Sequence, residues 1–105
     1  MMTSKECLVF ILDRLSGLDD ITFRAMMGGY IIYYRTKIIG GIYGGRFLIK
    51  PAETARKLLP EAKLEPPYEG AKDMLLVEEC VDGELLKKTV KAMYDELPFP
   101  KKKKK

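Results

Sequence analysis

The side chains that could take part in catalysis are few in this chain and are scattered along it. Two pairs of adjacent carboxylates, Asp19-Asp20 and Glu78-Glu79, flank predicted strands, and the two cysteines, Cys7 and Cys80, lie among apolar neighbours. The chain has no histidine, so the common base for a serine or cysteine nucleophile is missing. Zinc sites take most of their ligands from Cys and His. We therefore expect no catalytic residue, no metal and no cofactor.

The spacing of these groups supports the same expectation. Neighbouring residues of a strand point to opposite faces, so Glu78 and Glu79 are not expected to share a proton or a metal. Both cysteines are interpreted as small buried hydrophobes. Their even number permits a disulfide, but a cytosolic location favours the reduced thiols.

Two basic residues, Arg24 and Lys50, are the candidate anion site of the strand region. Both are expected on strands, where they would hold a small anion or an acidic group of a partner. The alternative is a structural role, in which they pair with Asp73 or Glu78 or extend along the surface to solvent. Three glycine pairs suggest a phosphate-binding loop, but they lack the Lys-Ser/Thr ending and the helix that such a loop needs.

The positive charge belongs to one end of the chain. The 105 residues carry a formal charge of +4, and Lys101 to Lys105 supply five of the 19 basic residues. We expect one folded domain over residues 1–98 and a disordered lysine-rich tail over 99–105. The sequence has no apolar run near the roughly 18 residues of a membrane span and no secretory signal. A cytoplasmic location is therefore expected.

The periodicity of apolar residues predicts a two-layer α+β domain of order αββββαβα. A capping box at Thr3 to Glu6 begins a helix that ends near Gly17. A loop is expected over 60–72. The antiparallel sheet is expected to hold about five strands, with flanking helices at 51–60 and after Gly83. The predicted strands are Ile21 to Met27, Tyr30 to Tyr34, Ile38 to Tyr43, Arg46 to Lys50 and Met74 to Val77.

The glycine pair Gly44-Gly45 is typical of a two-residue hairpin loop. Such a loop places Tyr43 opposite Arg46, Ile42 opposite Phe47 and Gly40 opposite Ile49. One sheet face then carries the core residues Ile38, Ile42, Phe47 and Ile49. The other face is mixed and carries Ile39, Tyr43, Arg46, Leu48 and Lys50.

This second face is the predicted site of protein contact. Aromatic residues with few charges mark the cores of interfaces, and we expect a homodimer or a partner protein there. The alternative is that helices cover this face. The expected interface residues are Tyr30, Ile32, Tyr34, Tyr43 and Leu48.

The run Arg24-Ala-Met-Met-Gly-Gly-Tyr30 resembles the TfoX N-terminal domain family, which includes the domain of the Sxy competence regulators. The family pattern is roughly Arg-x-Met-Phe-Gly-Gly-Tyr-Gly-Leu-Tyr, followed by a hairpin closing in Leu-Tyr-Leu-Lys. Met27 replaces the usual Phe, Ile31 replaces Gly, and Arg35-Thr36 replaces a Gly-containing turn. The residues that match in order and spacing are Arg24, Met26, Gly28, Gly29, Tyr30, Tyr33 and Lys50.

The resemblance implies a bacterial cytosolic protein whose fold is likened to secretion chaperones. It also implies a link to the transcriptional control of DNA uptake, although full competence regulators carry a second, C-terminal domain that this chain is not expected to hold. It implies structural roles for Met26, Gly28, Gly29 and Tyr33.

Three functional hypotheses follow from these observations. The first is a non-catalytic regulatory module that binds protein. The second is nucleic-acid binding through the lysine tail and the basic face of the last helix, Lys87, Lys88 and Lys91, with an affinity that falls steeply with salt. The third, a small enzyme, would need a pocket that gathers Arg24, Lys50 and a carboxylate.

Overall fold

The computed structural model describes residues 3–26, 28–78 and 82–97. Within these ranges the chain forms three α-helices, a short 3-10 helix and one six-stranded antiparallel sheet of order β1-β2-β3-β4-β6-β5. The expected strand residue Met27 lies outside the described residues. The elements are α1 (Ser4–Arg14), β1 (Ile21–Met26), β2 (Gly29–Tyr34), β3 (Lys37–Tyr43), β4 (Arg46–Ile49), α2 (Glu53–Leu58), β5 (Leu64–Glu65), β6 (Met74–Val77), α3 (Gly83–Met93) and η1 (Tyr94–Glu96).

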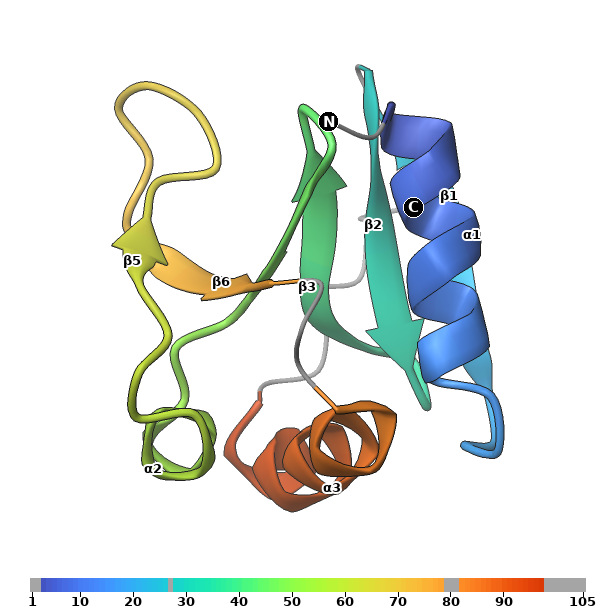
Figure 1. The fold of residues 1–105 in the computed structure, drawn as a ribbon, viewed down its shortest axis with the longest axis vertical. Helices are drawn as coiled ribbons and strands as arrows, with labels where there is room; N and C mark the ends of the chain where they lie inside the picture. Colours follow the sequence, from blue (N-terminus) through green and yellow to red (C-terminus); the bar gives the residue numbers. More distant parts are fainter. Residues whose placement is uncertain (1–2, 27, 79–81, 98–105) are drawn as a thin grey trace, which may run out of the picture.

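The predicted two-layer α+β architecture is confirmed. The helix α1 packs across β2, β3 and β4, and Figure 1 shows α2 and α3 side by side at one end of the sheet. Their buried residues join the same hydrophobic core as Ile32, Ile42 and Phe47 of the sheet, so all three helices cover one face. The strand β5 is an addition to the prediction, because it forms inside the segment 60–72 that was expected to be a loop.

Local sequence signals explain where the two longer helices begin. The Thr3 hydroxyl accepts from the Glu6 amide and the Glu6 carboxylate accepts from the Thr3 amide, which is the predicted capping box. The Asp82 carboxylate caps α3 by accepting from the Leu85 amide. Each cap satisfies backbone donors that the helix itself leaves without an acceptor.

The hairpin between β3 and β4 has the predicted register. Tyr43 pairs with Arg46, Ile42 with Phe47 and Gly40 with Ile49. Gly44 and Gly45 both have positive φ, 60° and 79°, as a type I′ turn requires. Ile42, Phe47 and Ile49 face the core as expected.

A β-bulge corrects the predicted placement of two isoleucines. Along β2 and β3, Tyr33 pairs with Ile38 but the next residue, Ile32, pairs with Gly40. Ile39 is therefore the extra residue of the bulge, and an extra residue changes which side chains point to which face. Ile39 is fully buried in the core cluster, while Ile38, predicted to be a core residue, is half-buried outside it.

The same bulge overturns the predicted face of three interface residues on β2. Tyr30 lies opposite Ile42 and Ile32 lies opposite Gly40, so both share the helix-covered face. Ile32 and Tyr34 are buried at 0% and 4% exposure, and Tyr30 packs against the core. A regular hairpin would have put all three on the other face, which explains the error.

The turn between β2 and β3 contains two residues whose backbone favours glycine. Arg35 and Thr36 have φ values of 50° and 71°, which cost non-glycine residues free energy, above all a β-branched one. We expect Thr36→Gly to raise the free energy of unfolding by about 1 kcal/mol, as measured by urea denaturation. Thr22→Gly, in the extended strand β1, should lower it, because glycine weakens a strand interior. Equal effects of the two changes would contradict a strained turn.

Candidate functional site

The sheet surface opposite the helices is the candidate functional site, and we call it the open face. Cross-strand pairing places Arg24 beside Ile31 and Thr22 beside Tyr33, and Tyr33 in turn beside Ile38. Ile31, Tyr33 and Ile38 are half-buried, and Arg24 is exposed. Lys50 follows the core residue Ile49 and so points to this same face. The open face is thus an apolar centre with a cation on each side.

Arg24 and Lys50 share a face but do not form one anion site. Arg24 lies on β1 and Lys50 directly follows β4, three steps away in the strand order. At about 4.8 Å a step, their strands are separated by about 14 Å. Among the described residues neither side chain forms an ion pair, including with the proposed partners Asp73 and Glu78.

The part of this surface around Arg46 and Tyr43 is contacted by the end of β5 and the segment that follows it. The Arg46 guanidinium donates to the Glu65 carboxylate at 2.8 Å and to the backbone oxygens of Pro66 and Pro67. Its Nε donates to the backbone oxygen of Tyr43. Pro67 is buried. Arg46 therefore clamps this segment to the sheet.

The clamp settles the placement of the two remaining predicted interface residues. The Tyr43 ring lies 6.4 Å from the Tyr68 ring of the clamped segment. Burial, and secondly the neighbouring Tyr68, raise the pKa of the Tyr43 phenol above its ordinary value. Leu48 is fully buried on this side of the sheet, outside the main core cluster. Tyr43 and Leu48 lie on the expected face, but they are largely covered.

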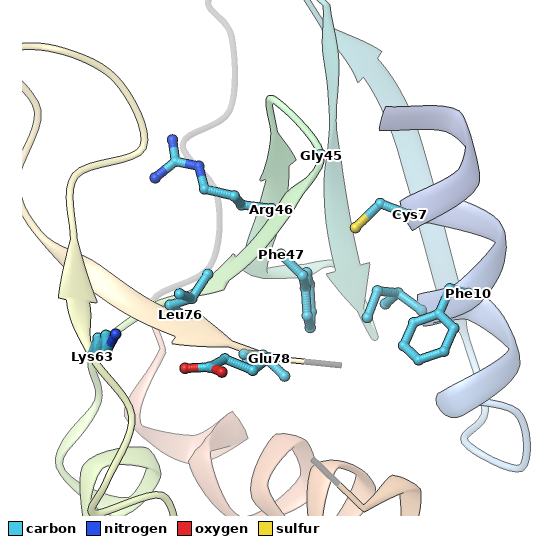
Figure 2. Close-up of a pocket in the computed structure, with 10 residues that line it drawn as sticks. Cys7, Phe10, Gly45, Arg46, Phe47, Lys63, Leu76 and Glu78 are labelled. Carbon is cyan, nitrogen blue, oxygen red and sulfur yellow. The ribbon is translucent and has the colours of Figure 1, made fainter. Parts of the chain in front are cut away.

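A cleft of about 520 Å³ opens between α1, β4 and β6 (Figure 2). Cys7, Phe10 and Phe47 give it an apolar wall, while Lys63 and Glu78 carry charges at its rim. The side chain of Arg46 extends from this cleft toward the segment between β5 and β6. Lys63 and Glu78 are both exposed, whereas catalytic acids and bases are usually set in desolvated surroundings. The cleft does not include Arg24 or Lys50, which the enzyme hypothesis required.

Other predicted groups have simple structural environments. Cys7 is buried at 5% exposure, as expected, while Glu79, Cys80 and the tail 99–105 lie outside the described residues. Within the described ranges no three Cys, Asp or Glu side chains gather as metal ligands would. No helix in those ranges is both long and apolar enough to cross a membrane.

The motif glycines have backbone reasons for their identity. Gly28 has a φ of 83°, in the left-handed region that favours glycine. A Cβ on Gly29 would overlap the backbone oxygen of Ile42 on the neighbouring strand. Met26 and Tyr33 lie half-buried on the first two strands, and Tyr33 belongs to the open face itself.

Sequence reasoning missed the half-buried apolar centre of the open face, Ile31, Tyr33 and Ile38. The available signal was Gly40-Gly41 inside a predicted strand, because glycine in a strand interior often marks a bulge. A bulge there reverses the alternation of the paired strand β2 and brings Tyr33, not Tyr34, to the open face.

Comparison with known proteins agrees with the motif. Residues 13–96 match the sequence profile described as the TfoX N-terminal domain. The chain is 28% identical over 109 residues to an "Uncharacterized 12.7 kDa protein in trpE 5′region" of Spirochaeta aurantia, which covers 99% of this chain and 91% of that protein. No solved structure matches the chain. Because the profile spans most of its length, the protein belongs to the TfoX N-terminal domain family.

Proposed function

We propose that this protein is a non-catalytic regulatory module of the bacterial cytoplasm that binds another protein through its open face. The observation that carries this proposal is the apolar centre Ile31, Tyr33 and Ile38, left without a helix cover among the described residues. Partly exposed aromatic and aliphatic side chains in one patch favour a protein interface over a solvated surface. The family relationship supports a role in the control of transcription, as in competence regulators.

The charges of the open face favour an acidic partner. Arg24 and Lys50 stand on opposite sides of the apolar centre, and neither is neutralised by an ion pair among the described residues. Cations that remain free at an interface rim attract a partner of opposite charge and fix its orientation. We therefore propose a partner segment with apolar side chains flanked by carboxylates.

The alternative function, nucleic-acid binding by the lysine tail and the last helix, draws little support from the described residues, which do not include the tail. The Lys87 ammonium donates to the backbone oxygen of Ser16 at 3.1 Å and forms an ion pair with Glu84 at 3.2 Å. Lys88 and Lys91 remain exposed, and two cations supply little of the phosphate neutralisation on which such binding depends.

Tyr33→Glu tests the proposed function in a bacterium that carries the gene. A carboxylate at the centre of the patch should reduce the binding free energy of the partner by about 2 kcal/mol, which weakens binding about 30-fold. We expect the variant to change transcript levels in the way that deletion of the gene does, at unchanged protein abundance. Val9→Glu, on the exposed side of α1 where Val9 is 62% accessible, should behave as the wild type.

A second pair of variants separates binding from catalysis in the same assay. Lys63→Met and Glu78→Gln remove the rim charges of the cleft and leave the open face intact. We expect both to retain the wild-type transcript pattern. Loss of that pattern in these two variants, with Tyr33→Glu unaffected, would overturn the proposal in favour of an active cleft.

A further inference from the structure

The strand β1 is a sheet edge whose outer side is available for pairing. It pairs with β2 along all six residues, and the order of the sheet places it at the end. Thr22, Phe23, Arg24 and Ala25 are exposed, and Phe23 is 48% accessible. Among the described residues no strand covers the other side of β1.

The backbone geometry shows which residues of β1 point outward. The Arg35 backbone amide donates to the backbone oxygen of Asp20 at 3.0 Å, next to the pair Ile21 and Tyr34. In an antiparallel ladder the hydrogen-bonding direction alternates from residue to residue. Asp20, Thr22 and Arg24 therefore direct their backbone groups toward β2. Ile21, Phe23 and Ala25 direct theirs outward.

This edge has few of the features that usually prevent strand pairing. Edge strands are commonly protected by short length, charged side chains, above all lysine, proline or a bulge. The opposite edge of this sheet, β5, has two residues. By contrast, β1 has six residues, no proline or lysine, a single charged residue, Arg24, and a register with β2 that is free of shifts.

The strand is self-complementary when a second copy lies antiparallel to it. Outward residues pair with outward residues, so Ile21 of one copy can pair with Phe23 of the other, and Thr22 then faces Thr22. In this register Arg24 of each copy lies opposite Asp20 of the second copy, the turn residue that directly precedes β1. Aromatic with β-branched, threonine with threonine, and opposite charges are the stabilising cross-strand combinations.

Other registers are less favourable for the same groups. A shift of the centre to Arg24 would set two arginines directly opposite each other, which is destabilising. A centre at Phe23 would leave Arg24 opposite Thr22 and separate it from Asp20. The register centred on Thr22 brings Arg24 of one copy close to Asp20 of the other and also covers the exposed ring of Phe23. That ring already packs against Tyr30 of its own copy, with 5.8 Å between the ring centroids.

We propose that two copies of this protein associate through β1, antiparallel and centred on Thr22, into one continuous sheet. The association covers a single six-residue strand per copy, so it buries less than the standard interface area and depends on concentration. Because Thr22 and Arg24 belong to the same side as Tyr33, the dimer joins the open faces of the two copies. The dimer does not depend on the proposed regulatory function, but in it Arg24 is paired with Asp20 of the second copy, which leaves Lys50 to attract an acidic partner.

Charge reversal at the predicted pair tests this proposal on the purified chain. Arg24→Glu places a carboxylate opposite Asp20 twice per dimer, and we expect the dissociation constant from light scattering or sedimentation to rise at least about 10-fold. Adding Asp20→Lys should restore association. Lys88→Glu makes the same charge change on α3 and should leave the dissociation constant unchanged. A monomer at all concentrations, or a dimer insensitive to Arg24→Glu, would overturn the proposal.

A cross-link tests the register directly. In a chain with Cys7→Ala and Cys80→Ala, Thr22→Cys should form a disulfide-linked dimer on mild oxidation, because the two sulfur atoms would face each other across the strands. Ala25→Cys lies on the same exposed edge, but in this register the two introduced thiols of the dimer would lie far apart. This variant should therefore stay monomeric. Equal cross-linking of both variants would exclude the Thr22-centred pairing. Neither test requires the unidentified partner, so a negative result leaves the Tyr33→Glu prediction standing.

Discussion

Gly40→Ala is expected to lower the free energy of unfolding by about 3 kcal/mol or more. A Cβ at this position would overlap the backbone oxygen of Leu48 and approach the Cα of Ile49 to 2.7 Å. Both obstacles belong to the backbone of β4, so they cannot rotate away as the end of a side chain can. The two central strands would have to separate beside the bulge. Urea denaturation followed by circular dichroism measures the effect.

Gly44→Ala is the matched control for this prediction, because it changes the same residue type in the same hairpin. A Cβ on Gly44 meets no atom within 4 Å, but Gly44 has a φ of 60°. Its cost is therefore backbone strain alone, about 1 kcal/mol. If Gly40→Ala costs no more than Gly44→Ala, then β3 and β4 do not approach as closely at Gly40 as the structure indicates.

The fold was largely predictable because its signals are local. The capping box at Thr3 and Glu6, the turn at Gly44-Gly45 and the apolar periodicity of the helices each act within a few residues. Such signals located the main strands and helices and the register of the β3–β4 hairpin. The strand β5 escaped prediction because two residues, Leu64 and Glu65, carry no periodicity of their own and form a strand by pairing with β6.

The candidate site was harder to predict because it depends on a single extra residue. Ile39 bulges out of the pairing with β2, and this one step exchanges the faces of Ile31 and Ile32 and of Tyr33 and Tyr34. Alternation with a period of two does not itself show which of the two sets of residues faces the core. The sequence therefore indicated an apolar open face correctly in kind but assigned it mostly to the wrong residues.

The clamped segment shows a second limit of sequence reasoning. Arg46 was expected on the mixed face of the sheet, and it lies there. Its partners Glu65, Pro66 and Pro67 come from a segment that has no strong pattern. Contacts between residues about 20 positions apart are set by the arrangement of β4, β6 and β5, which is itself a result of folding.

Lys37→Ala is the second substitution for which we expect a large loss of stability. Lys37 is 6% exposed, which is rare for a lysine. Its ammonium donates to the backbone oxygen of Tyr94 at 3.0 Å and lies 4.1 Å from the centre of the Tyr94 ring. The Tyr34 ring in turn meets Tyr94 edge-on at 5.4 Å. Lys37 thereby joins the start of β3 to η1, 57 residues later in the chain.

The expected loss is about 3 kcal/mol, since Lys37→Ala removes a charged hydrogen bond, a desolvated cation–π contact and a buried stem. Lys37→Met keeps the stem and should lose about half as much. The Lys57 side chain is 75% exposed and pairs with Glu53 within α2, so Lys57→Ala should change the free energy of unfolding by less than about 0.5 kcal/mol. Amide hydrogen exchange should quicken at Tyr94 to Leu97 in both Lys37 variants and not in Lys57→Ala. Unchanged exchange at Tyr94 would mean that other contacts of η1, rather than the Lys37 ammonium, hold it against the β2–β3 turn.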